Sequence, residues 1–168
     1  VMIDWIKKKN IKNIYIVGVK ELVDEIEKKT DVNNTSDNPD LIIVAYDKEL
    51  TYQKLETACE LINRGVPYYL SHVDIFCPTL KGNMPDCGAI GILIEKTTGK
   101  KSINNFGKPS DLMADYISNI LSKEINKTMV GDRIHTDIEL GKKLGADTVL
   151  VCSGEYQAST DKNHSIKD

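Results

Sequence analysis

Apolar and polar residues alternate in blocks along most of this chain. Short runs rich in Val, Ile, Leu and Tyr, with few polar residues inside them, predict strands. Nearly continuous apolar runs are typical of parallel strands, because helices usually cover both faces of a parallel sheet. The runs at residues 13–17, 41–46, 67–70 and 128–131 therefore predict an α/β fold built from βαβ units around a parallel sheet.

Helices are predicted between these strands, where apolar residues recur every three to four positions. The clearest pattern covers residues 51–64. A polar loop is predicted at residues 33–40, and the aperiodic segment after Gly154 predicts loop or disorder. The remaining predictions are helices at about 19–29, 87–98, 110–123 and 134–144, and a last strand at 148–152.

The composition narrows the class of protein. The 168 residues carry 22 basic and 25 acidic side chains, the formal net charge is −3, and the lysines are spread along the chain. A nucleic-acid partner is not expected, because such a partner requires clustered Lys and Arg. A membrane partner is not expected either, because no apolar run approaches ~20 residues. The four cysteines form no CxxC pair, which favours reduced thiols in a cytoplasmic protein.

The first candidate for chemistry is a pair of aspartates around a strand-to-helix turn. Asp132 follows the apolar strand that ends at Gly131, and Asp137 lies about one turn into the next predicted helix. Ligands of open α/β sheets bind at this carboxyl edge, and two carboxylates there can converge on Mg²⁺. The alternative is that Asp132 is a turn residue and Asp137 only complements the helix dipole.

The second candidate is Gly107-Lys108-Pro109-Ser110, a turn that opens a predicted helix. A lysine held at such a turn places a positive charge near backbone N–H groups, and both favour a phosphate group. On its own this signal is weak, because surface lysines beside turns are common.

Taken together, the two segments closely resemble the third and fourth motifs of the haloacid dehalogenase (HAD) superfamily. The lysine motif precedes one helix, and the following strand ends in Gly-Asp-x-x-x-Thr-Asp at residues 131–137. The sequence of residues 141–154 also resembles the C-terminal end of that family. The segment from Ser71 to Ile90 narrows the resemblance to the NagD-like branch, and the whole resemblance covers about residues 1–155.

The resemblance implies an organisation into two domains and a tail. Residues 1–103 would form a large α/β cap, and residues 104–155 would form the C-terminal part of a Rossmann-like core. Residues 156–168 would be a polar tail. Members of this branch often pair through their caps, so a homodimer is a further expectation.

The resemblance also implies a chemistry. Relatives hydrolyse phosphate monoesters of small metabolites through an aspartyl-phosphate, with Mg²⁺ as cofactor. Lys108 matches the lysine that binds the phosphoryl group and stabilises its charge. Asp132 matches the aspartate that ligates the metal, and Asp137 matches the acidic residue that supports metal and lysine.

The first and second motifs of the family are absent from the sequence. The nucleophile and the general acid/base of the family belong to an Asp-x-Asp-Gly segment, and no Asp-x-Asp occurs in these 168 residues. We therefore expect a fragment that is inactive alone. The main alternative is a noncatalytic module that binds a ligand or partner through the cap. A receiver-like or flavodoxin-like domain is a weaker alternative, since it leaves the paired motifs unexplained.

Substrate choice in this interpretation depends on the cap segment 71–89. His72 and Asp74 could reach a substrate hydroxyl or amine, although Asp74 could equally order its own loop. A competing hypothesis is a zinc site formed by these two residues with Cys77 and Cys87. It is the weaker hypothesis, because the cysteines lack paired spacing and Cys87 begins an apolar helix.

Overall fold

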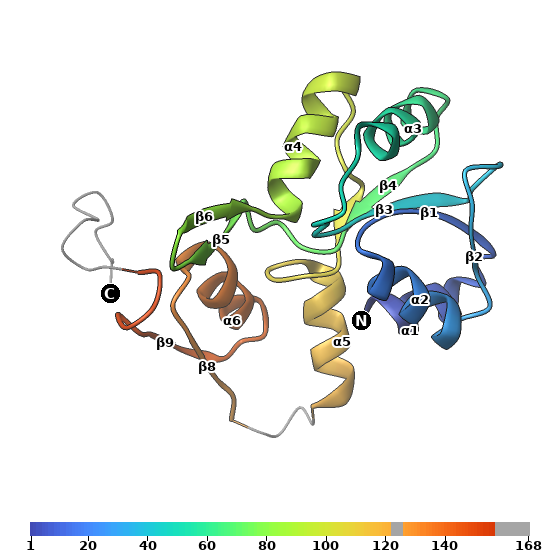
Figure 1. Cartoon of the computed structure of the whole chain (residues 1–168). Coiled ribbons are helices and arrows are strands. Elements are labelled where there is room, and N and C mark those ends of the chain that lie inside the picture. Colours follow the sequence, from blue (N-terminus) through green and yellow to red (C-terminus); the bar gives the residue numbers. More distant parts are fainter. Residues whose placement is uncertain (122–125, 157–168) are drawn as a thin grey trace. The chain divides into compact units, whose positions relative to one another are not determined.

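The computed structural model describes residues 1–121 and 126–156 (Figure 1). The chain divides into two compact units, the first of which is Val1–Gly107 and the second of which begins at Lys108. The cap boundary that the resemblance implies, between residues 103 and 104, remains a prediction.

The first unit is built on a five-stranded parallel sheet. Its strand order is β2-β1-β3-β4-β7, and all four pairings are parallel. All four residues of the central strand β3 are buried, as the continuous apolar run predicted. The α/β fold class is therefore confirmed. The strands are β1 (Asn13–Val17), β2 (Asn33–Asn34), β3 (Leu41–Val44), β4 (Tyr68–Leu70) and β7 (Asn104–Asn105).

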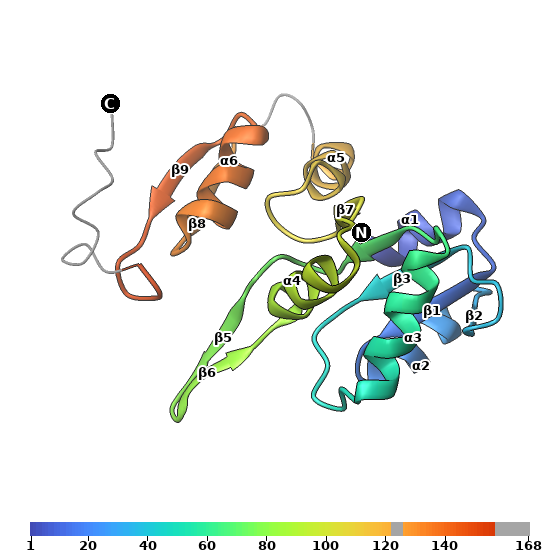
Figure 2. The same ribbon diagram turned by 90° about the horizontal axis from the view of Figure 1, so that it is seen from above.

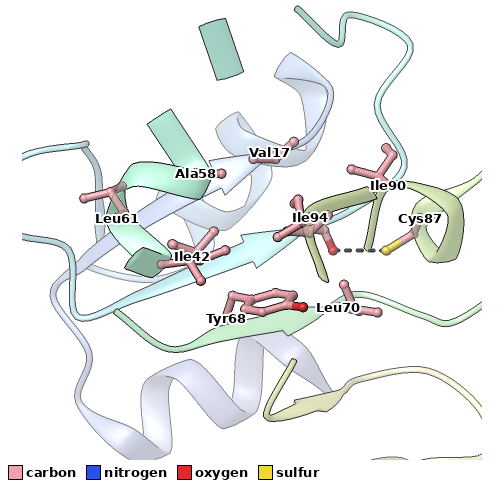
Figure 3. Close-up of a cluster of buried hydrophobic side chains, with 11 residues drawn as sticks. Val17, Ile42, Ala58, Leu61, Tyr68, Leu70, Cys87, Ile90 and Ile94 are labelled. Carbon is pink, nitrogen blue, oxygen red and sulfur yellow. Dashed lines mark hydrogen bonds between the residues drawn. The ribbon is translucent and has the colours of Figure 1, made fainter. Parts of the chain in front are cut away.

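Helices cover both faces of this sheet. On one face lie α3 (Tyr52–Asn63) and α4 (Cys87–Thr98), and on the other lie α1 (Met2–Lys9) and α2 (Lys20–Lys29) (Figure 1). On the α3 and α4 face, Ile42 and Ile94 belong to one core cluster and are 0% exposed (Figure 3). Each fully buried side chain of this kind contributes about 1.5–3 kcal/mol to folding.

Polar residues fix the ends of the helices. Thr51 caps α3, because its hydroxyl accepts the N–H of Lys54 at 3.2 Å. Asp86 caps α4 in the same way through the N–H of Cys87. At the other end of α4, Gly99 takes a left-handed conformation, φ 70°, which glycine adopts without strain.

The second unit contains a smaller sheet of two parallel strands. These are β8 (Thr128–Gly131) and β9 (Asp147–Leu150), and Figure 2 shows helix α6 (Glu139–Lys143) beside them. The periodicity predicted one α-helix at about residues 134–144 between the strands, and this prediction was wrong in part. The segment begins as the π-helix η1 (Ile134–Ile138) and continues as α6 (Glu139–Lys143). The unit begins with α5 (Asp111–Ile120), and the end predicted for that helix, at residue 123, lies outside the described residues.

Two segments in which no strand was predicted contain strands. Residues 33–40 include the edge strand β2, and the cap segment 71–89 includes a hairpin of β5 (Phe76–Thr79) and β6 (Gly82–Pro85). The predictions were wrong there because both regions are rich in polar residues and proline and lack the apolar alternation of a strand. Most of the predicted polar tail lies outside the described residues. Within residues 1–121 and 126–156, every helix is too short or too polar to cross a membrane.

Candidate active site

Strand β8 ends at Gly131 and places Asp132 at the carboxyl edge of the small sheet. The carboxylate is held by the chain that follows β9, because its Oδ2 accepts the backbone N–H of Glu155 at 2.7 Å. This hydrogen bond is the main reason that the pKa of Asp132 is below its usual range. The positive charges of Arg133 and Lys108 lower that pKa further. Asp132 is therefore an ionised carboxylate at neutral pH.

Asp137 lies in η1, and its side chain is almost completely buried. Its Oδ1 accepts a charge-assisted hydrogen bond from Nζ of Lys108 at 2.5 Å, and its Oδ2 accepts the N–H of Arg133 at 3.2 Å. A Cβ at Gly131 would lie 2.6 Å from Oδ2 of Asp137, so only glycine leaves room for this carboxylate. Both carboxylate oxygens therefore have partners within the same unit.

Lys108 begins the second unit, and a cis peptide bond joins it to Pro109. Ser110 then caps α5, because its hydroxyl accepts the N–H of Met113 at 3.1 Å. The ammonium group of Lys108 reaches Asp137 although the two residues are 29 positions apart. The structure thus brings Lys108 and Asp137 into contact, and Asp132 lies within the field of the same lysine.

A magnesium ion would find one suitable carboxylate here. Asp132 offers hard oxygen atoms at the end of a strand, and Mg²⁺ commonly takes one or two carboxylates together with waters and phosphate oxygens. Asp137 is less suited to direct ligation, since Lys108 and Arg133 already occupy its oxygens. Within the described part of the chain, no group of three or more His, Cys, Asp and Glu side chains is placed to hold a metal ion.

In the first unit, His72 is held from both sides. Its Nε2 lies 2.7 Å from Oδ1 of Asp86, and its Nδ1 lies 2.8 Å from the hydroxyl of Ser71. Asp86 was missed in the sequence analysis. An acidic residue directly before an apolar helix is a helix-cap signal, and that signal could have identified it.

Asp74 lies at the base of the hairpin, where its carbonyl accepts the N–H of Gly88 at 2.8 Å. A Cβ at Gly88 would lie 2.7 Å from that carbonyl oxygen, so the hairpin base lies directly against α4. The backbone of Asp74 thus orders this loop, and a role of its carboxylate in substrate binding remains a prediction.

The two cysteines of the competing zinc hypothesis differ in their surroundings. Cys87 is fully buried, its thiol donates to the carbonyl of Val44 at 3.1 Å (Figure 3), and burial raises its pKa. The thiol of Cys77 lies near the carbonyl of its neighbour Pro78. These surroundings favour a packing role for Cys87.

Three further residues that sequence reasoning missed surround Asp132 and Asp137. Glu155 and Gly154 contact Asp132, and Arg133 contacts Asp137 through its backbone N–H. Their contacts are mostly made by backbone atoms, which leave no signature in side-chain chemistry. The only available signal was the Ser153-Gly154 pair directly after the last apolar strand.

Comparison with known families agrees with this geometry. A family model described as HAD-hydrolase-like matches residues 105–167. Among curated proteins, the 5'-nucleotidase YutF of Bacillus subtilis is 29% identical over 163 residues, which cover 96% of this chain and 61% of the relative. The ribonucleotide monophosphatase NagD of Escherichia coli K12 is 30% identical over 152 residues, which cover 90% of this chain and 59% of the relative.

Solved structures give the same picture. A 4-nitrophenylphosphatase from Thermotoga maritima matches with a TM-score of 0.86 at 36% identity, and the match covers 94% of this chain and 61% of that protein. A protein described as a putative nagD protein matches with a TM-score of 0.82 at 35% identity and covers 92% of this chain and 62% of that protein. The chain thus spans about three fifths of the length of these relatives.

Proposed function

Since this chain is a homologue of the NagD-like phosphatases of the HAD superfamily, as its motifs predicted, we propose that it forms part of a magnesium-dependent phosphatase. The substrate class is a small phosphate monoester, and the reaction proceeds through an aspartyl-phosphate formed on a nucleophile outside these 168 residues. The observation that carries the proposal is the contact between Lys108 and Asp137 beside the carboxylate of Asp132.

Lys108, Asp132 and Asp137 have different electrostatic roles in this proposal. Lys108 offers its ammonium group to the oxygens of the transferring phosphoryl group, whose negative charge it offsets. Asp137 holds that ammonium group in place through the 2.5 Å contact. Asp132, ionised and fixed by the N–H of Glu155, would hold Mg²⁺. When bound, this cation neutralises charge on the phosphate and polarises its oxygens.

The cap segment supplies the proposed selectivity. His72 carries hydrogen bonds to Ser71 and Asp86, so its ring is fixed in one orientation. We propose that this fixed ring and the carboxylate of Asp74 contact the part of the substrate that is not phosphate. We further propose a homodimer formed through the cap and a cytoplasmic location, and four free cysteines support the latter.

The proposal is tested on the enzyme that contains this segment. Lys108→Ala and Asp132→Asn are each expected to lower the rate of 4-nitrophenyl phosphate hydrolysis by about 10²–10³, as losing one electrostatic contact to a transition state does. Activity is measured with and without Mg²⁺. The matched control is Lys143→Ala, which removes a lysine of the same unit that is paired with Asp111. Rates of both site variants within twofold of the control would contradict the proposal.

The noncatalytic alternative has one observation in its favour, the absence of an Asp-x-Asp motif from the sequence. In that alternative, the cap would bind a ligand or a partner, and no phosphate ester would be hydrolysed. Hydrolysis of 4-nitrophenyl phosphate and binding of small phosphate esters, both measured on the complete protein, separate the two functions. Binding to the complete protein without any turnover would favour the alternative.

A further inference from the structure

An ion pair beside Asp132 has no part in the function proposed above. Nε of Arg133 contacts Oε2 of Glu155, and the two side chains are 25% and 34% exposed. Arg133 directly follows Asp132, whereas Glu155 lies 22 positions further along the chain. The pair therefore joins the end of β8 to the turn that follows β9.

That turn lies directly on the carboxylate of Asp132. The N–H of Glu155 donates to Oδ2 of Asp132 at 2.7 Å. At Gly154, an added Cβ would lie 2.6 Å from Cγ of Asp132, a distance too short for any side chain. The ladder between the strands continues up to this turn, since the N–H of Val151 donates to the carbonyl of Gly131 at 2.9 Å.

The backbone of Arg133 is fixed as well. Its N–H donates to Oδ2 of Asp137 at 3.2 Å, and its carbonyl accepts the N–H of Asp137 at 3.0 Å. Arg133 is thus connected to Asp137 through its backbone and to Asp132 through Glu155. Arg133 therefore links Asp132, the proposed metal ligand, to Asp137, which binds the ammonium group of Lys108.

We propose that Arg133 and Glu155 are positioning residues for Asp132. Their ion pair holds the segment 153–155 against the carboxylate, and we call this segment with its ion pair the strap. The strap fixes the orientation in which Asp132 binds a divalent cation. The second part of the inference rests on the proposed magnesium role of Asp132, whereas the first concerns this chain alone. Because the pair is partly exposed, we expect its loss to change equilibria by about two- to fivefold rather than by orders of magnitude.

The strap is tested without any metal, through hydrogen exchange of the Glu155 amide in the ¹⁵N-labelled chain. Arg133→Gln removes the ion pair and leaves both residues around that amide unchanged, so its intrinsic exchange rate stays the same. We expect protection to fall about two- to fivefold. Arg133→Lys should retain most of the protection, because lysine keeps the positive charge that pairs with Glu155.

Two controls separate the strap from general loosening. Glu139→Gln breaks an exposed ion pair of the same unit, with Lys142, and should leave the Glu155 amide unaffected. In Arg133→Gln, the exchange of the Val151 amide shows whether β8 and β9 remain paired. If this pairing is lost, Glu155→Gln is used as a second variant that removes the same ion pair. Unchanged protection in Arg133→Gln, or no measurable protection in the unsubstituted chain, would overturn the strap.

Titration with Mg²⁺ tests the consequence for the cation. In the unsubstituted chain, Mg²⁺ should shift the amides of residues 131–133 and 154–155, and Asp132→Asn should abolish the shifts. Arg133→Gln should raise the dissociation constant about two- to fivefold, and Arg133→Lys should restore it. No Mg²⁺-dependent shift in the unsubstituted chain would contradict the proposed magnesium role. An unchanged dissociation constant in Arg133→Gln would overturn the positioning role alone.

Discussion

In the first unit, helices cover both faces of the parallel sheet, whereas in the described part of the second unit one face of the sheet is exposed. In β3, every residue is buried. In the second unit, the register partners Val130 and Val149 are 59% and 45% exposed, whereas Met129 and Thr148 on the opposite face lie against Gly141 of α6. Parallel sheets are normally covered on both faces, so the described part of the second unit has little apolar core.

The chemistry-bearing residues lie in the unit with the smaller core. Lys108, Asp132 and Asp137 are held by ion pairs and by backbone hydrogen bonds. Such contacts fix direction, but each contributes only about 1 kcal/mol to stability. The first unit therefore has the larger stabilising core, whereas the second unit carries Lys108, Asp132 and Asp137 of the candidate site.

The largest expected effect is a difference in hydrogen exchange between the two sheets. Amides of β3 and β4 should open only with the whole first unit, whose unfolding costs about 5 kcal/mol or more. Amides of β8 should exchange through local opening, about a thousandfold faster. Exchange measured by NMR on the chain decides this. Equal protection of β3 and β8 in a monomer would contradict the comparison.

Core substitutions sharpen the same contrast. Ile42→Ala removes a fully buried side chain and should destabilise the first unit by about 2–5 kcal/mol. Val130→Ala removes an exposed one and should change the second unit by less than about 0.5 kcal/mol. Urea unfolding followed at resolved amides of each unit measures both values. A loss above about 2 kcal/mol in Val130→Ala would show that this face is packed.

Sequence reasoning was most successful where side chains decide the structure. The apolar run at residues 41–46 and the helix spacing at residues 51–64 each indicated buried positions, and the observed elements, Leu41–Val44 and Tyr52–Asn63, lie within these ranges. The short strand β2 and the hairpin were missed, because main-chain pairing forms them without an apolar pattern. The π-helical start of η1 was missed because helical periodicity does not distinguish the two helix types.

The same physical reason limited the prediction of the site. Lys108, Asp132 and Asp137 were predicted from motifs, because their chemistry belongs to their side chains. Glu155 was not identified, because its contact to Asp132 is a backbone N–H from a residue 23 positions away. Only folding brings such a donor to the carboxylate.

Matched helix caps test whether the units respond independently. Thr51→Ala removes the cap of α3 in the first unit, and Ser110→Ala removes the cap of α5 in the second. Each should cost about 1 kcal/mol in its own unit. The same unit-resolved urea experiment measures both. A shift of the first unit in Ser110→Ala would show that the units unfold together.

The smallest expected effect is the response of each unit to acid. In the first unit, Oδ2 of Asp40 accepts the N–H groups of Asn13 and Lys12, each at 3.0 Å, and these bonds lower its pKa. In the second unit, the N–H of Glu155 lowers the pKa of Asp132. A carboxylate with a lowered pKa stabilises the fold fully above its unfolded pKa of about 3.9, and this stability is lost as pH falls through the folded value.

Both units should therefore keep constant stability from these carboxylates above about pH 5 and lose it below about pH 4. Both carboxylates are solvent-accessible, so each loss should stay below about 1 kcal/mol. Asp40→Asn should flatten the acid response of the first unit and leave that of the second unchanged. Asp31→Asn, a matched change of charge at an exposed position in the first unit, is the control. Unit-resolved urea unfolding between pH 3 and 6 measures the response. An acid response in Asp40→Asn equal to that of the control would show that the bonds from Lys12 and Asn13 contribute nothing to folding.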